Sequence, residues 1–155
     1  MRISNVLHKS LVIPTVEATD KAAALREIAT FMCHNSPQIP HSPKVVYEAI
    51  AQREEHGSTG VGEGVAIPHA KLPELPGLVA AFGVSQRGIP YEAIDQQPAR
   101  LIFMLLVPER SGGAHLKALA RISRLLKNSI FREQLLSLNE ASGIYEAFVQ
   151  QDSTI

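Results

Sequence analysis

The chain has 155 residues, of which 45% are hydrophobic and 19% are charged, and its 15 Lys and Arg residues balance 15 Asp and Glu residues. That length suits one domain with a core of its own, so we expect a single domain over residues 1–155. A formal net charge of zero argues against general nucleic-acid binding, which needs a basic face to displace counterions from phosphates.

The N-terminus and the cysteine content indicate the compartment. The first residues mix polar with apolar side chains and lack the uninterrupted apolar core of a signal peptide. Cys33 is the only cysteine, so no internal disulfide can form, which fits a reducing cytosol. The most apolar run, Leu101 to Pro108, is too short to span a bilayer and is typical of a buried strand. We therefore expect a soluble, cytoplasmic protein without membrane insertion.

The first expected elements are a strand over residues 10–15 and a helix from Asp20 to about His34. Either Asp20 or Thr19 can supply the N-cap of this helix, because a short polar side chain accepts a hydrogen bond from the first free amides. Its apolar residues recur at helical spacing and are expected to face the core; they are Leu25, Ile28, Ala29 and Met32.

A second helix is expected between Ser42, as its N-cap, and Gly57, which follows its end. Pro43 occupies the first helical position, where its fixed φ favours the helix. The inward face of this helix consists of Val46, Ala49, Ile50 and Arg53. Arg53 therefore continues an apolar stripe with a positive charge.

Strands and helices alternate in the rest of the chain. Strands are expected over 65–68, 78–86 and 100–108, and a turn-rich link over 88–98 joins the last two. Helices are expected from Ala114, over 130–138 and over 140–150, the last with Asn139 as a possible cap. The expected core side of the first of these is Leu116, Leu119, Ile122 (or Ala120) and Leu126. This order predicts an α/β fold, a single domain in which helices flank a mixed β-sheet.

Four glycines, at positions 57, 60, 62 and 64, stand between a helix and a strand. A dinucleotide-binding fingerprint would need them after a strand and before a helix, and residue 65 is valine where the last glycine belongs. A P-loop would need a lysine at a spacing that Lys71 does not have. Neither motif is present, and the expected feature is a loop whose backbone amides can approach another group closely.

The rigid part of this segment is the approach to His69. Pro68 fixes its own φ and restricts Ile67 to extended geometry, so the backbone that carries His69 has little freedom. We expect an imidazole at the end of a strand, near loop amides and the hydroxyls of Ser58 and Thr59. Such a place suits an anion, and Ser58 and Thr59 are candidate phosphate-binding residues.

The histidine at position 69 can take part in a chemical reaction at this anion site. Neutral imidazole is a nucleophile near pH 7 and can accept a phosphoryl group. Arg53 can neutralise the arriving charge bidentately, and His115 can supply a second donor. An apolar rim would limit hydrolysis and could include Leu72 or Leu78, whereas Glu63 is expected to point into solvent.

The segment REEHGSTGVGEGVAIPHAK, residues 53–71, resembles the active-site signature of the fructose- and mannitol-type enzyme IIA domains (EIIA type 2) of the bacterial phosphotransferase system. The similarity is strongest to their stand-alone nitrogen-regulatory relatives. Residues 93–109 and 114–123 are similar to the same family in order and spacing, so the resemblance covers essentially the whole chain. It implies the mixed sheet flanked by helices.

By this resemblance His69 is the phosphorylated histidine, Arg53 contacts the phosphate, and His115 is the second active-site histidine. The phosphate donor would be HPr or an HPr-like nitrogen carrier, and no cofactor is implied. A metal is not expected either, because the other histidines show no ligand spacing with Cys33; they are His8, His34, His41 and His56.

Three functions remain open at this point. The first is a phosphocarrier with a regulatory output in nitrogen, carbon or potassium signalling, favoured because no IIB or membrane-spanning IIC segment is fused to this domain. The second is a free-standing IIA subunit that passes phosphate to a IIB protein of a fructose- or mannitol-type permease. The third, an interaction module without phosphotransfer, is disfavoured because Arg53, His69 and His115 are all retained.

Overall fold

The structure is a computed structural model that describes all 155 residues. Its strands are β1 (Leu7–Ile13), β2 (Gly60–Gly62), β3 (Val65–Ala66), β4 (His69–Leu72), β5 (Val79–Ile89) and β6 (Ala99–Pro108). Its helices are the short 3-10 helix η1 (Ile3–Asn5), α1 (Lys21–Asn35), α2 (Pro43–Glu55), α3 (Ala114–Leu126), α4 (Ser129–Ser137) and α5 (Ala141–Asp152).

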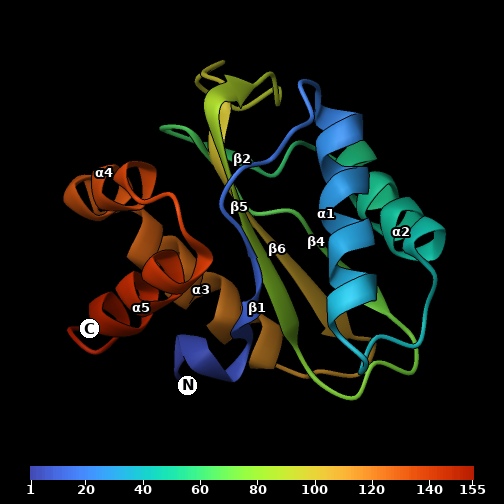
Figure 1. Cartoon of the computed structure of the whole chain (residues 1–155). Helices are drawn as coiled ribbons and strands as arrows, with labels where there is room; N and C mark the ends of the chain where they lie inside the picture. The colour runs from blue at the N-terminus through green and yellow to red at the C-terminus, as the bar shows by residue number, and fades with distance from the viewer.

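The strands form one mixed sheet with the order β1-β5-β6-β3-β2, and β4 also pairs with β6. β1 is parallel to β5, and β3 and β4 are parallel to β6, whereas β5 and β6 are antiparallel. Figure 1 shows α1 and α2 on one side of the sheet and α3, α4 and α5 on the other. The predicted α/β fold with a mixed sheet flanked by helices is confirmed.

Strand β6 lies inside the sheet, and this position accounts for the most apolar run of the sequence. Successive side chains of a strand point to opposite faces, so Ile102 and Met104 join the core under α1 and α2. Phe103 and Leu105 join the core under the other helices. Both faces need apolar residues, which gives a continuous run instead of an alternating one.

No helix of the structure has the length and apolarity that crossing a membrane would require.

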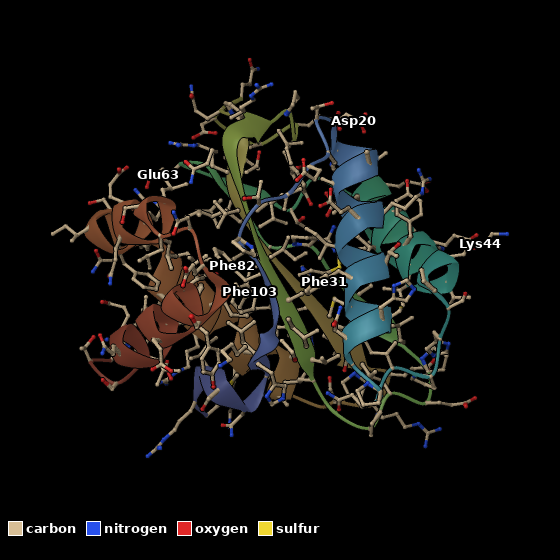
Figure 2. The ribbon with its side chains drawn as sticks, in the orientation of Figure 1. Asp20, Phe31, Lys44, Glu63, Phe82 and Phe103 are labelled. Carbon is tan, nitrogen blue, oxygen red and sulfur yellow. The ribbon has the colours of Figure 1, made fainter.

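An aromatic cluster fills the core between the sheet and the C-terminal helices. Phe148 of α5 packs edge-to-face on Phe82, Phe103 and Phe131, with ring centroids 4.8, 5.6 and 5.2 Å away. Figure 2 shows Phe82 and Phe103 beside the sheet, opposite α1. Edge-to-face pairs add attraction beyond the burial of apolar area, so this cluster fixes the C-terminal layer on the sheet.

Two of the expected helix caps are confirmed and one is wrong. The Asp20 side chain accepts a hydrogen bond from Ala23 N, and the Ser42 side chain accepts one from Val45 N. Asn128 caps α4, which begins one residue earlier than the expected segment. The expectation of Asn139 as a cap is wrong, because α5 begins after Glu140 and has no side-chain cap.

The inward face of α3 differs from the expected stripe. Ala118, Ile122, Leu125 and Leu126 are buried, Leu119 is half-buried, and Leu116 is 63% exposed. The buried positions follow the steps of four, three and one that keep residues on one side of a helix. Leu116 lies two residues before Ala118 and therefore points away from that side. The expectation that Leu116 belongs to the core is wrong.

The glycine-rich segment is a hairpin and not only a loop. β2 and β3 pair antiparallel, and the turn between them has positive φ at Gly62, Glu63 and Gly64. A Cβ on Gly60 would lie 2.8 Å from Cβ of Ala93, so this position admits no side chain. The expected strand over 65–68 is shorter, since β3 covers only Val65–Ala66. A separate strand, β4, begins at His69, because Pro68 has no N–H for a continuous ladder.

The two ends of the chain are tied together by Asp152, which is only 5% exposed. One carboxylate oxygen accepts a hydrogen bond from Ile3 N at 2.8 Å, and the other accepts one from Nε of Arg121 at 2.5 Å. Charge-assisted hydrogen bonds are stronger than neutral ones. The carboxylate thus holds η1, α3 and α5 to one another.

Replacing Asp152 by alanine is expected to lower the free energy of unfolding by about 3 kcal/mol, because it leaves a buried amide without an acceptor and a guanidinium without its partner. Urea unfolding at neutral pH measures this loss. Glu146→Ala is the matched control, since Glu146 is exposed on the same helix and makes no ion pair. Equal stability of the two variants would contradict the proposed tie.

Candidate functional site

A cavity of about 460 Å³ lies beside β4, between α2 and the first turn of α3. Its lining residues are Ala49, Gln52, Arg53, His56, His69, Ala70, Lys71, Val107 and His115. The structure therefore brings Arg53, His69 and His115 to one place, although 62 residues (53 to 115) separate the first from the last. α2 belongs to one helix layer and α3 to the other, so the cavity lies where both layers meet the sheet.

The backbone that carries His69 is held on both sides of Pro68. Ile67 N donates to the carbonyl of Thr59 at 3.0 Å, and the carbonyl of Pro68 accepts a hydrogen bond from Leu105 N at 2.9 Å. His69 then begins β4, paired with Leu105 of the central strand β6. Together with the fixed φ of proline, these bonds leave the imidazole on a rigid support.

The His69 ring has one engaged and one free nitrogen. Nδ1 lies 2.9 Å from the carbonyl oxygen of Ile67. A carbonyl can only accept a hydrogen bond, so Nδ1 carries the proton in the neutral ring, and Nε2 keeps its lone pair. Nε2 has no partner within the chain, and the side chain is half-buried in the cavity wall. Nε2 is thus the nucleophilic atom that this geometry offers.

Arg53 stands in the last turn of α2, where the apolar stripe of that helix reaches the cavity. Its Nη1 donates to the carbonyl of Gly57 at 2.9 Å, which fixes the guanidinium next to the end of the helix. The other N–H groups form no hydrogen bond within the chain, and a guanidinium has five of them in a planar fork. Arg53 can therefore bind an anion while it stays anchored.

His115 reaches the cavity from the first turn of α3. Its Nδ1 lies 3.1 Å from the hydroxyl of Ser111 and 3.1 Å from the carbonyl of Gly112. With Nδ1 donating to that carbonyl, Nε2 becomes a second donor when the ring is protonated. The amino-terminal end of α3 adds the positive end of a helix dipole on the same side.

Sequence reasoning missed three polar residues of this lining: Gln52, His56 and Lys71. Gln52 and His56 are four positions apart, and His56 Nδ1 donates to the carbonyl of Gln52 at 3.0 Å. The helical spacing of Gln52, Arg53 and His56 was the available signal. The cavity contains three histidines, one arginine and one lysine but no carboxylate, so its electrostatics favour an anion.

Ser58 and Thr59 lie outside this lining, and their hydroxyls are engaged elsewhere. The Ser58 hydroxyl donates to the carbonyl of Tyr91 at 2.8 Å and accepts from Gly60 N at 3.1 Å. Thr59 is 5% exposed, and its hydroxyl bonds to the Glu54 carboxylate and lies 3.1 Å from the Tyr91 hydroxyl. The structure places both residues in the support of the loop and not in contact with the cavity.

A buried polar cluster supports the cavity from behind. The Glu54 side chain, 6% exposed, pairs with Nζ of Lys21 at 2.9 Å and accepts a hydrogen bond from Thr59 N at 3.1 Å. Lys21 Nζ also lies 4.5 Å from the centre of the Tyr91 ring. Glu54 directly follows Arg53, so this cluster fixes the helix turn that carries Arg53 to α1 and to the loop before β2.

Alkaline pH is expected to destabilise the fold through Tyr91. Burial and the Glu54 carboxylate raise the pKa of its phenol far above the ordinary value. Above about pH 10, where free tyrosine ionises, the unfolded chain loses a proton that the folded chain keeps. Above that pH the free energy of unfolding should therefore fall by up to about 1.4 kcal/mol per pH unit. Below it the phenol is protonated in both the folded and the unfolded chain, and Tyr91 makes its full contribution to stability.

Urea unfolding of wild type and Tyr91→Phe between about pH 9 and about pH 11 measures the effect of Tyr91. The phenylalanine variant starts from a lower stability, because it lacks the hydroxyl beside Thr59, but should lose less of it as the pH rises. Parallel pH profiles for the two proteins would exclude this role of Tyr91.

Leu72 or Leu78 is expected at the apolar rim of the cavity, and Glu63 is expected to point into solvent. Leu72 is 2% exposed and belongs to the core under α1 and α2, so it cannot form a rim. Leu78 is half-buried against the opposite core. The Glu63 side chain is 68% exposed, as expected, and also pairs with Nη2 of Arg132 at 2.9 Å.

Comparison with known proteins identifies the family of this chain. Residues 5–151 match the family described as phosphoenolpyruvate-dependent sugar phosphotransferase system, EIIA 2. The chain is 38% identical over 154 residues to a nitrogen regulatory protein of Bradyrhizobium diazoefficiens, covering 99% of each chain. It is 36% identical over 152 residues to the fructose-specific EIIABC component of Bacillus subtilis, covering 98% of this chain and 24% of that protein.

A solved structure shares the fold. The nitrogen regulatory protein IIA-Ntr from Neisseria meningitidis superposes with a TM-score of 0.87 at 29% identity, over 94% of this chain and 98% of the other. Family match, relatives and fold coincide over nearly the whole length. The chain therefore belongs to the EIIA type 2 family of the bacterial phosphotransferase system, which confirms the resemblance seen in residues 53–71.

Proposed function

We propose that this protein is a phosphohistidine carrier that accepts a phosphoryl group on Nε2 of His69 from an HPr-type protein. One observation carries the proposal: His69 keeps Nε2 free in a cavity lined by Arg53 and His115 and by no carboxylate. Family membership supports phosphoenolpyruvate as the source of the phosphoryl group, passed on through the carriers of the phosphotransferase system.

The phosphoryl group passes by direct displacement from the imidazole of the carrier to the imidazole of His69. The lone pair of His69 Nε2 attacks phosphorus, a new N–P bond forms, and the N–P bond of the carrier's phosphohistidine breaks. The carrier's ring, protonated on its other nitrogen, keeps the electron pair of the broken bond and leaves as neutral imidazole. The positive ring charge thereby moves to His69, where the Nδ1–H bond to the carbonyl of Ile67 stabilises it.

The cations of the cavity stabilise the transferred group. Arg53 presents free N–H groups to the phosphoryl oxygens, and protonated His115 adds a donor from the facing helix. Lys71 follows His69 by two residues on β4 and adds a further positive charge. Fixed donors that face developing negative charge lower the barrier most when they need no rearrangement.

An HPr-type carrier would dock around the cavity. Leu116 follows His115 directly, is 63% exposed, and offers an apolar contact that the core does not use. Val45 of α2, 42% exposed, is another apolar side chain without a core role. Exposed apolar side chains beside a charged cavity are typical of partner surfaces. Exchange with such a carrier places the proposed function in the cytoplasm.

We assign the output to regulation, in which the phosphorylation state of His69 selects the protein that is bound. Full-length similarity to the Bradyrhizobium nitrogen regulatory protein supports this output. The second candidate is a IIA subunit that passes phosphate to a IIB protein, which the similarity to the fructose-specific EIIABC component favours. Incubating the phosphorylated protein with a fructose-type IIB domain separates the two, since only the second predicts rapid transfer.

Incubation with phosphoenolpyruvate, enzyme I and HPr tests the phosphocarrier function. We expect one acid-labile phosphoryl group per chain, with N–P coupling to Nε2 of His69 in the NMR spectrum of the ¹⁵N-labelled protein. The nitrogen-type HPr-like carrier, tested in parallel, should give the same product at a different rate. No phosphorylation with either carrier, or coupling to Nδ1, would refute the proposed chemistry.

A further inference from the structure

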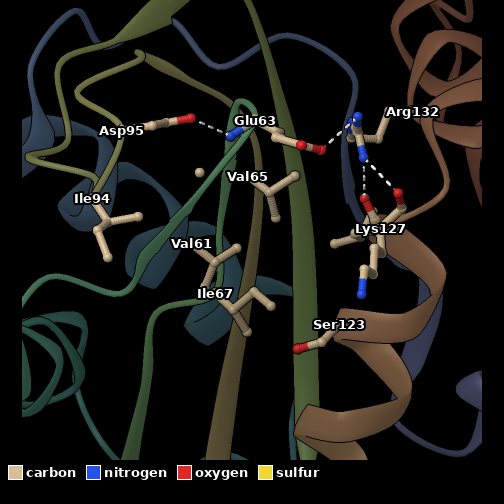
Figure 3. A pocket seen from close by; sticks show the side chains of 11 residues that line it. Val61, Glu63, Val65, Ile67, Ile94, Asp95, Ser123, Lys127 and Arg132 are labelled. Carbon is tan, nitrogen blue, oxygen red and sulfur yellow. Dashed lines mark hydrogen bonds and ion pairs between the residues drawn. The ribbon is translucent and has the colours of Figure 1, made fainter.

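A second cavity, of about 440 Å³, lies on the other side of the hairpin β2–β3, against the end of α3. Five of its lining residues are apolar: Val61, Val65, Ile67, Ile94 and Leu126. Figure 3 shows Ile94 on one side of this space and Ser123 and Lys127 on the other. Its volume falls within the range of small-molecule sites, which are mostly apolar with a few polar groups.

Two apolar side chains at this cavity have no role in the core. Ile94 is 88% exposed and Val61 is 56% exposed. Both face the cavity from segments that the fold holds in place, since the Asp95 carboxylate accepts a hydrogen bond from Glu63 N at 2.8 Å across the turn. An occupant that covered Ile94 and Val61 would remove their apolar area from water.

The charges of the lining decide which occupant fits. Both carboxylates are engaged: Asp95 by the amides of Glu63 and Gln97, and Glu63 by Nη2 of Arg132 at 2.9 Å. The other terminal nitrogen of Arg132 donates to the carbonyls of Leu126 and Lys127. The Lys127 ammonium makes no ion pair or hydrogen bond, and neither does the Ser123 hydroxyl.

We infer that this cavity binds a small amphipathic carboxylate, whose apolar body packs on Val61, Ile67 and Ile94 and whose carboxylate meets Lys127 and Ser123. One uncommitted ammonium matches one negative charge. A phosphate ester carries more charge than Lys127 alone can balance, because Arg132 is already engaged three times. A cationic amphiphile would meet the Lys127 ammonium, and the one lining carboxylate without an ion pair, Asp95, already accepts hydrogen bonds from two backbone amides.

Octanoate is the probe for this site, and octylammonium, which has the same chain and the opposite charge, is its counterpart. Titration of the ¹⁵N-labelled, unphosphorylated protein should give saturable shifts of the amides of Val61, Val65 and Ile67 with octanoate and weaker ones with octylammonium. The measurement needs no phosphocarrier, so its outcome is independent of the proposed phosphotransfer. Absence of saturable shifts at these amides, or tighter binding of octylammonium, would overturn the inference.

Two variant pairs locate the binding. Lys127→Gln should weaken octanoate binding about fivefold. Lys117→Gln, at an exposed lysine of α3 outside the lining, should leave it unchanged. Ile94→Ser should weaken it similarly, and Ile130→Ser, at an equally exposed isoleucine outside the cavity, should not. Equal affinities within either pair would contradict the assigned contacts.

Discussion

Replacing His69 by alanine is expected to abolish phosphorylation of this protein by phosphoenolpyruvate, enzyme I and HPr. The variant lacks the imidazole whose Nδ1 is held by the carbonyl of Ile67 and whose Nε2 is free in the cavity, at the start of a strand paired with the centre of the sheet. No second nucleophile can replace it, because His115 and His56 enter from helices without the rigid Pro68 support. Radiolabelled phosphoenolpyruvate and an acid-lability assay measure the loss.

His34→Ala is the matched control, since His34 is exposed at the end of α1 and outside the cavity. It should be phosphorylated like the wild type. The fold should survive in both variants, because His69 is half-buried and none of its side-chain contacts crosses the core. Retained labelling of a folded His69→Ala protein would mean that another residue accepts the phosphoryl group.

Replacing Arg53 by glutamine is expected to lower the rate of phosphoryl transfer to His69 by about 100-fold. The guanidinium supplies a fixed positive charge and several donors to the phosphoryl oxygens, and glutamine supplies neither the charge nor the planar fork. Rapid-quench kinetics with phosphorylated HPr in excess measure the single-turnover rate. Arg53→Lys should retain part of it, because the charge remains while bidentate contact is lost.

Arg87→Gln controls for the loss of one positive charge, because Arg87 is exposed on β5 and its side chain makes no hydrogen bond or ion pair within the chain. Its transfer rate should equal that of the wild type. Since Arg53 also donates to the Gly57 carbonyl, urea unfolding must show that Arg53→Gln keeps its stability within about 1 kcal/mol. If a stable Arg53→Gln variant accepted the phosphoryl group at the wild-type rate, Arg53 would have no role in the transfer.

Much of the fold could be predicted because its signals are local. Asp20 and Ser42 mark the beginnings of α1 and α2 through hydrogen bonds that span three residues, and Pro43 occupies the first position of α2. The long strand β6 could be recognised by its apolar run. The short strands β2 and β4 could not, because glycines and Pro68 interrupt the pattern, and pairing with β3 and β6 is what makes them strands.

The candidate site residues that belong to the sequence motif could be predicted. Those that only the folding of distant segments brings to the cavity could not. Arg53 and His69 belong to one signature, and His115 was found through the same resemblance. Ser58 and Thr59 are near His69 in sequence, but Tyr91, more than thirty residues later, engages both hydroxyls. His56 and Lys71 were missed because only the packing of α2 beside β4 brings them together.

Ile67 connects two places that share no other residue. Its side chain forms part of the wall of the second cavity, while its carbonyl accepts the hydrogen bond from His69 Nδ1. Without that hydrogen bond the proton would no longer be held on Nδ1, and Nε2 would lose its fixed lone pair. One residue therefore orients the imidazole with its backbone and lines the neighbouring cavity with its side chain.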